Sequence, residues 1–163
     1  MSKTLVITFA IGIAVIAVAI GGVFYMQRGA HITLPGKVLK VRTAPLDDNS
    51  SVAVIDFRVT NPSDYKFMAK SVTVVLEDKS GAQTDGETSS QMDTERLMAG
   101  IPLLGQKYND TLKERDTVSP HGTMDRMVAA RFEVPEAKLD ARKRFVVRVE
   151  EVDGMVSEFG EQR

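Results

Sequence analysis

The chain has 163 residues, a formal net charge of −1 and no cysteine. The balanced charge gives no sign of a nucleic-acid partner. The absence of thiols excludes a disulfide framework, a thiolate metal site, a cysteine nucleophile and a lipid anchor on an N-terminal cysteine. A chain of this length is expected to hold one domain with a short appendage.

The first predicted element is an apolar segment from Leu5 to Met26, which contains no charged residue. About 20 apolar residues are enough for a helix to cross the hydrocarbon of a bilayer, and the polar stripe of a helix in a protein core is absent. Lys3 precedes the segment, Arg28 follows it, and Tyr25 stands where an interfacial aromatic is expected. We therefore expect an N-terminal tail at 1–4, a transmembrane helix that acts as a signal anchor at 5–27, and a tether at 28–36.

A cleaved signal peptide is the alternative, because Ala17-Val18-Ala19 matches the small-residue cleavage pattern. The apolar run continues beyond Ala19 and exceeds the roughly 7–15 residues of a usual signal core, which favours an uncleaved anchor. The short N-terminal tail favours a cell-membrane protein with its C-terminal domain outside the cytoplasm, in the periplasm. A literal count of Lys and Arg on the two sides of the helix favours the opposite, cytoplasm-facing orientation, which stays open.

From residue 37 onward, apolar and polar residues alternate with the period of two that is typical of β-strands. In the first strand Leu39 and Val41 are expected to share the core face, and in the second Asp56 and Arg58 point away from it. The strands are expected at 37–44, 51–60, 70–78, 125–134 and 143–152, with a weak sixth in 110–118. The pattern predicts an all-β fold, an immunoglobulin- or fibronectin-like β-sandwich over 37–155, before a C-terminal tail at 156–163.

One insert interrupts the strands. Residues 78–90 are polar and contain glycine, which predicts a loop. Ser90 and Asp93 form a capping-box pattern, and Gly100 with Pro102 ends the helix that follows. We expect a helical insert at about 90–104.

The insert is the first candidate contact surface. Its large apolar residues either cap an open end of the sandwich core or stay exposed as a patch for a protein or lipid partner. On the second interpretation the contact residues are Met98, Ile101, Leu103 and Leu104.

A basic cluster is the second candidate. Arg142, Lys143 and Arg144 would attract anionic lipid headgroups if they were exposed near a membrane. The alternative is a solvated strand start that Glu150 and Glu151 balance.

No pattern of catalytic or metal-binding residues stands out. His31 and His121 are the only histidines, and no zinc spacing or nucleophile elbow is present. A triad of His121 with Ser119 and Asp116 or Asp125 is disfavoured, because Ser119 lies in the same tight turn. A loop calcium site in the stretch DDNSS (47–51) stays open beside an ordinary polar turn. We expect a protein that is not an enzyme and has no catalytic residue, cofactor or metal site.

The second strand ends in DFRVTNPSD, residues 56–64. Pro62 cannot donate to a sheet ladder, and Asn61 favours local bonds between its side chain and the backbone. The residue before a proline is also pushed into an extended conformation. We therefore expect Asn61-Pro62 to end the strand in a turn.

The same turn carries a family resemblance. The segments VAVIDFRVTNPSDYKFMAKSVTVVLE and SPHGTMDRMVAARFEV resemble the water-stress and hypersensitive-response (WHy) domain of late-embryogenesis-abundant (LEA) proteins. Asn61-Pro62 match the strand-ending motif of that family, and VTVVL at 72–76 matches its next strand. The stretch SPHGT departs from the family's Pro-Gly turn by an inserted histidine. Bacterial exported immunoglobulin-like domains tethered by a lipid or a single helix are a second similar group.

The resemblance covers roughly 37–152 and implies a sandwich with a stress- or envelope-associated role without known catalysis, and lipid contact in some relatives. We expect a non-enzymatic single-pass membrane protein that presents its sandwich to a protein or lipid partner at the cell envelope. The alternative is an envelope protein for desiccation or water-stress protection that has no defined ligand.

Overall fold

The computed structural model describes residues 3–26 and 33–161, and within 3–26 it describes the side chains of 9 and 11–23 only. The chain divides into two units near residue 31. The first contains helix α1 (Lys3–Met26), which coincides with the predicted apolar segment. Arg28, His31 and most of the predicted tether lie outside the described residues.

A membrane-spanning helix is not established. Among the described residues, no helix has both the length and the apolar character needed to cross a membrane. The transmembrane helix expected at 5–27 therefore stays a prediction of the sequence.

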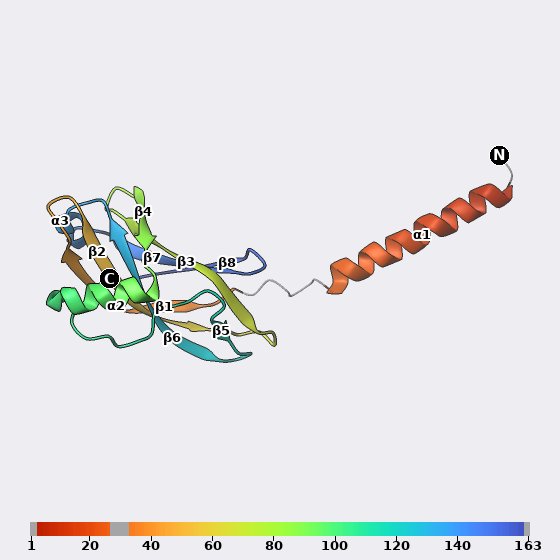
Figure 1. Ribbon diagram of the computed structural model, residues 1–163. Helices are drawn as coiled ribbons and strands as arrows, with labels where there is room; N and C mark the ends of the chain where they lie inside the picture. The colour runs from red at the N-terminus through yellow and green to blue at the C-terminus, as the bar shows by residue number, and fades with distance from the viewer. Residues whose placement is uncertain (1–2, 27–32, 162–163) are drawn as a thin grey trace. The chain divides into compact units, whose positions relative to one another are not determined.

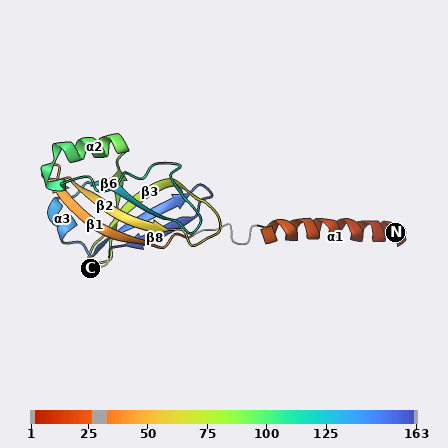
Figure 2. The same cartoon turned by 90° about the horizontal axis from the view of Figure 1, so that it is seen from below.

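The second unit is a β-sandwich (Figures 1 and 2). One layer contains β1 (Gly36–Pro45), β2 (Ser51–Thr60) and β6 (Thr123–Phe132). The other contains β3 (Phe67–Glu77), β7 (Arg144–Glu151) and β8 (Val156–Gly160), with the short β5 (Thr117–Val118) on β3. The named strands all pair antiparallel. The fold class expected from the alternating pattern is thus confirmed as a β-sandwich.

Strand β4 (Gln83–Thr88) joins the two layers. Its first part, 83–86, pairs with β3, and Glu87 and Thr88 pair with β6. The resulting order is β1-β2-β6-β4-β3-β7-β8. Strand β4 thus continues the edge of one layer into the edge of the other.

The main core lies between the layers. Phe57, Phe132 and Phe145 are fully buried there, and the rings of Phe132 and Phe145 contact each other at 5.7 Å between centroids with their planes tilted by 39°. The alternating apolar residues of β2, β6 and β7, as the period of two predicts, place one face of each strand in this core. In β1 the register shifts between Val38 and Lys40, so Val38 and Val41 face the core while Leu39 is exposed, against the prediction. The extra residue of a β-bulge explains this reversal.

Three elements were missed. Residues 83–88 form β4 although a loop was expected, and 156–160 form β8 although a tail was expected. Helix α3 (Glu136–Asp140) places the fully buried Leu139 in the main core. The weak sixth strand shrinks to β5 and a single bridge at Thr111.

The turn after β2 is held by the side chain of Asn61, which is fully buried. Its amide nitrogen donates to the carbonyls of Tyr65 at 2.7 Å and Val118 at 3.1 Å. Its amide oxygen accepts from the backbone N–H of Ser63 at 3.0 Å and from the Ser63 hydroxyl at 2.8 Å. The expected role of Asn61-Pro62 as a strand-ending turn is confirmed, and Asn61 also joins this turn to β5.

Candidate functional site

The insert between β4 and β6 forms an additional layer on the outer face of the β1–β2–β6 sheet (Figure 2). It contains helix α2 (Gln91–Gly100) and the 3-10 turn η1 (Pro102–Leu104). The hydroxyl of Ser90 caps α2 by accepting from the backbone N–H of Asp93 at 3.2 Å, as the capping pattern predicts. The helix ends at Gly100, which the sequence also predicted.

A second apolar cluster attaches this layer to the sheet. The outer face of the sheet contributes buried Val52, Val54 and Met127, and η1 contributes Leu104, which is fully buried. Half-buried Leu97, Met98 and Ile101 pack against this cluster. The insert therefore covers a sheet face and does not cap an open end of the core.

We define the α2–η1 surface by Arg96, Leu97, Met98, Ile101 and Leu103, of which Arg96 and Leu103 are exposed and the other three are half-buried. Leu103 is 74% exposed, whereas its neighbour Leu104 has no exposed area. A shallow, mainly apolar depression of ≈ 430 Å³ is lined by Asp93, Arg96, Leu97, Gly100 and Ile101. Of the four contact residues expected from sequence, Leu103 is exposed, Met98 and Ile101 are half-buried, and Leu104 is excluded because it packs inward.

A charged clasp holds the strap that follows η1, residues 105–111. Arg42 on β1 donates to the carbonyls of Leu104 and Gln106, both at 2.7 Å. The same guanidinium binds the carboxylate of Asp56 at 2.6 Å, and the two side chains are only 8% and 2% exposed. The other oxygen of Asp56 accepts from the side-chain amide of Asn109 at 2.8 Å. The clasp fixes the position of the α2–η1 surface on the sheet.

Sequence reasoning missed the clasp. Asp56 was expected to face solvent because it alternates with apolar core residues. The missed signal was that Val52 and Val54, on the same face as Asp56, are apolar too. A strand that is apolar on both faces is expected to be covered on both.

The basic cluster proposed for headgroup contact forms ion pairs within the domain. Arg142 is buried, binds Glu161 at 2.9 Å through two nitrogens, and lies over the ring of Phe145 at 4.5 Å. Lys143 and Arg144 both bind the carboxylate of Glu77 at 2.6 Å. Burial removes Arg142 from the lipid-facing patch that the sequence predicted. Lys143 and Arg144 are partly exposed and clamp the start of β7 to the end of β3, and their contact with headgroups stays a prediction.

The carboxylate of Glu77 responds to that clamp. Hydrogen bonds from Lys143 and then Arg144 lower the pKa of Glu77 from its ordinary value of 4.5. Two cations stabilise the charged form of a carboxylate, which explains the direction of the shift.

His121 does not assemble a triad. It binds Asp64 in the neighbouring turn at 2.8 Å, and both side chains are exposed. Asp116 pairs with Arg126 at 2.8 Å and Asp125 with Arg58 at 2.6 Å, so these carboxylates serve as partners of arginines. Among the residues that the structure describes, no group of three or more His, Asp or Glu side chains could hold a metal ion.

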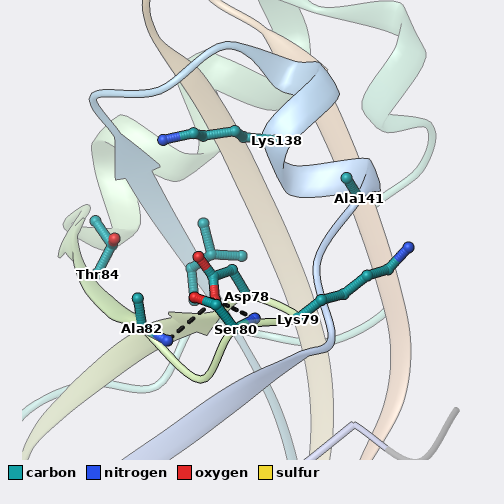
Figure 3. Close-up of a pocket in the computed structure, with 8 residues that line it drawn as sticks. Asp78, Lys79, Ser80, Ala82, Thr84, Lys138 and Ala141 are labelled. Atoms are coloured by element: carbon teal, nitrogen blue, oxygen red, sulfur yellow. Dashed lines mark hydrogen bonds between the residues drawn. The ribbon is translucent and has the colours of Figure 1, made fainter.

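A pocket of ≈ 270 Å³ lies between the β3–β4 turn and α3 (Figure 3). Lys79 and Lys138 line it and extend toward opposite sides. The carboxylate of Asp78 is bound within its own turn by the backbone N–H groups of Ser80 at 2.7 Å and Ala82 at 3.0 Å. The hydrogen bond from the Ser80 hydroxyl is the main cause that lowers the pKa of Asp78. This arrangement stabilises a turn and brings no reactive groups together.

Comparisons with known proteins identify no family for this chain. No family model and no curated protein matches the chain. A β-sandwich protein from Clostridium difficile 630 is similar in structure, at 9% identity over 78% of this chain and 85% of that chain, with a TM-score of 0.40. The archaellum periplasmic stator protein FlaG from Sulfolobus acidocaldarius is similar at 8% identity over 78% of this chain and 99% of that chain, with a TM-score of 0.35.

Proposed function

We propose that the protein is a non-enzymatic, membrane-anchored module that binds a protein partner through the α2–η1 surface. The observation that carries this proposal is the 74% exposure of Leu103 on an insert whose Leu97 and Ile101 line an apolar depression. Exposed apolar groups next to such a depression are typical of protein-binding sites. The charged clasp holds the backbone of this surface in place, which limits the entropy lost on binding.

The anchor is the second part of the proposal. Its support is the sequence from Leu5 to Met26, which has no charged residue and the length that a bilayer requires. We place the sandwich outside the cytoplasm, because the short N-terminal tail followed by a long apolar segment is typical of a signal anchor. The cytoplasm-facing orientation remains the alternative, since Lys and Arg are more numerous after the segment than before it.

A second candidate function is stress protection by a WHy-like domain without a defined ligand. The buried, fully bonded Asn61 favours it, because the Asn-Pro turn is the motif on which the family resemblance depends. The two candidates differ at the α2–η1 surface, which the first requires and the second does not.

In-cell photocrosslinking tests the binding proposal. A benzophenone amino acid replaces Leu103 in the full chain, and the matched control carries it at Lys79, an exposed residue of the β3–β4 turn. We expect a discrete adduct from position 103 that is absent from position 79, and we expect Arg96→Glu to reduce its yield. Equal crosslinking from both positions would refute the α2–η1 surface as the binding site.

Orientation has its own test. The chain has no cysteine, so Lys79→Cys provides a single thiol for a membrane-impermeant maleimide. Labelling in intact cells is expected for an extracytoplasmic sandwich. Labelling only after lysis would establish the cytoplasm-facing alternative.

A further inference from the structure

The chain joins the sandwich beside the turn between β7 and β8. The backbone N–H of Leu34 donates to the hydroxyl of Ser157 at 2.8 Å, and the carbonyl of Pro35 accepts from the backbone N–H of Thr60 at 3.0 Å. The side chain of Leu34 is 1% exposed, so this attachment is part of the core. These contacts show at which end of the sandwich the chain enters the domain, namely the end that carries the β7–β8 turn.

The β7–β8 turn exposes apolar side chains at that same end. We define the β7–β8 tip as Val152, Met155 and Val156. Val152 is 55% exposed and Val156 49% exposed, while Met155 is half-buried. Tyr65, 62% exposed, lies at the same end, because the backbone N–H of Val152 donates to the carbonyl of Met68 at the start of β3.

The tip has a fixed shape. The backbone N–H of Glu151 donates to the carbonyl of Met155 at 2.8 Å, and the N–H of Gly154 donates to the carbonyl of Glu151 at 2.9 Å. Gly154 has φ 92°, a conformation that side chains disfavour. The carboxylate of Asp153 accepts from the backbone N–H of Met155 at 3.0 Å, so this side chain folds back against the turn that contains it.

We infer that the β7–β8 tip is a second membrane contact, which inserts its valines at the boundary between lipid headgroups and acyl chains. The inference rests on the membrane anchor proposed above. Eight residue steps connect Met26 to Leu34, and an extended chain covers at most about 3.6 Å per step, so this connection cannot exceed about 29 Å. Tyr65 has the amphipathic ring that membrane interfaces favour.

The charges at this end specify the lipid chemistry. Lys37 and Lys66 are exposed here, and so are Asp64 and Asp153. Exposed Lys113, Glu114 and Arg115 adjoin the same end, so cations and anions are mixed there and do not form a one-sign patch for acidic headgroups. The contact is therefore apolar, and it should form on a zwitterionic phosphatidylcholine bilayer as well as on an acidic one.

Single-cysteine labelling of the full chain tests the inference. The absence of native cysteine allows an environment-sensitive fluorophore at Val152→Cys or Val156→Cys. Ile16→Cys in α1 reports the anchor, and Asp48→Cys, in the exposed β1–β2 turn at the opposite end of the strands, reports bulk water. Each labelled chain is reconstituted in phosphatidylcholine vesicles with and without quencher-carrying lipids, with the quencher near the top of the acyl chain for positions 48, 152 and 156 and near its end for position 16.

We expect lipid quenching at positions 16, 152 and 156 and none at position 48. Quenching at 16 with a water-like signal at 152 and 156 would overturn the tip contact and leave the anchor intact. No quenching at 16 would overturn the anchor, and the tip contact with it. A blue-shifted signal at 152 without lipid quenching would show that a protein surface covers the tip, which also overturns the inference.

A second variant tests the apolar character. Val152→Asp in the chain labelled at 156 should abolish quenching at 156. Because Val152 is largely exposed, this variant should keep the circular dichroism spectrum and thermal transition of the parent. Unchanged quenching in this variant would contradict the apolar contact.

Discussion

At the scale of single residues, the clearest test of the fold is the buried amide of Asn61. Replacing it by alanine leaves the carbonyls of Tyr65 and Val118 without their donor in the protein interior. An unsatisfied buried group costs about 1–3 kcal/mol, so Asn61→Ala should lower the free energy of unfolding by this amount. Urea unfolding of the chain in detergent measures it.

The control for this variant is Asn49→Ala in the exposed β1–β2 turn. An exposed substitution of this kind should change the free energy of unfolding by less than about 0.5 kcal/mol. Similar losses for the two variants would show that the network around Asn61 contributes nothing specific.

The ion pairs of Glu77 with Lys143 and Arg144 should make the stability of the domain depend on pH. Its pKa is lowered from 4.5 in the folded chain by Lys143 and Arg144. The folded state therefore binds protons less readily than the unfolded state, and the clamp's stabilisation is fully present above pH 4.5. It is lost as the pH falls through the lowered pKa.

The Glu77→Gln variant removes that titration. Its stability should be lower than that of the parent at pH 7, and the difference should shrink as the pH falls below 4.5. Thermal unfolding between pH 7 and pH 3 measures both chains. A constant difference across this range would contradict the ion-pair account.

At the scale of elements, two adjacent leucines separate the structural side of the insert from its exposed side. Leu104 is fully buried against the outer face of the β1–β2–β6 sheet, so Leu104→Ala should cost about 2–5 kcal/mol of stability. Leu103 is 74% exposed, so Leu103→Ala should leave stability within about 0.5 kcal/mol of the parent. Equal losses in thermal or urea unfolding would mean that η1 is oriented differently.

A second prediction for the insert concerns the charged clasp of Arg42 and Asp56 that holds residues 105–111. Asp56→Asn leaves the charge of buried Arg42 without its partner and should cost about 3–5 kcal/mol. The matched control is Asp125→Asn, whose pair with Arg58 is 33% and 43% exposed and should contribute only about 0–1 kcal/mol. The first variant should also become sensitive to proteolysis within 105–111, and resistance there would argue against the clasp.

The sequence predicted elements where local chemistry decides them. Five strands follow from alternation, and α2 follows from Ser90 at its start and Gly100 at its end. The sequence did not predict β4, because its side chains are nearly all exposed polar groups. Only Gly86 is buried in β4, where the ring of Phe132 would lie 2.6 Å from a Cβ atom.

The candidate site was predicted in part. Leu103 was placed correctly on an exposed surface, but Leu104 was not, because a 3-10 turn and not an extended α-helix decides which of the two points inward. The partners of Arg142 and Asp56 lie 19 and 53 residues away along the chain. An ion pair or a hydrogen bond over such a separation depends on the tertiary fold and cannot be deduced from local patterns.

At the scale of the whole molecule, the chain consists of an apolar N-terminal segment followed by a two-layered sandwich with an insert on one outer face. The α2–η1 surface and the β7–β8 tip are separate parts of this domain. The first is proposed to bind a protein, and the second a lipid surface. Both roles require that the N-terminal segment stays attached to the sandwich in the mature protein.

Intact mass analysis of the membrane and aqueous fractions of expressing cells tests this requirement directly. We predict a chain that retains residues 5–26 and stays in the membrane fraction after washing with alkaline carbonate. Recovery of a shorter chain that begins after Ala19 in the aqueous fraction would contradict the account.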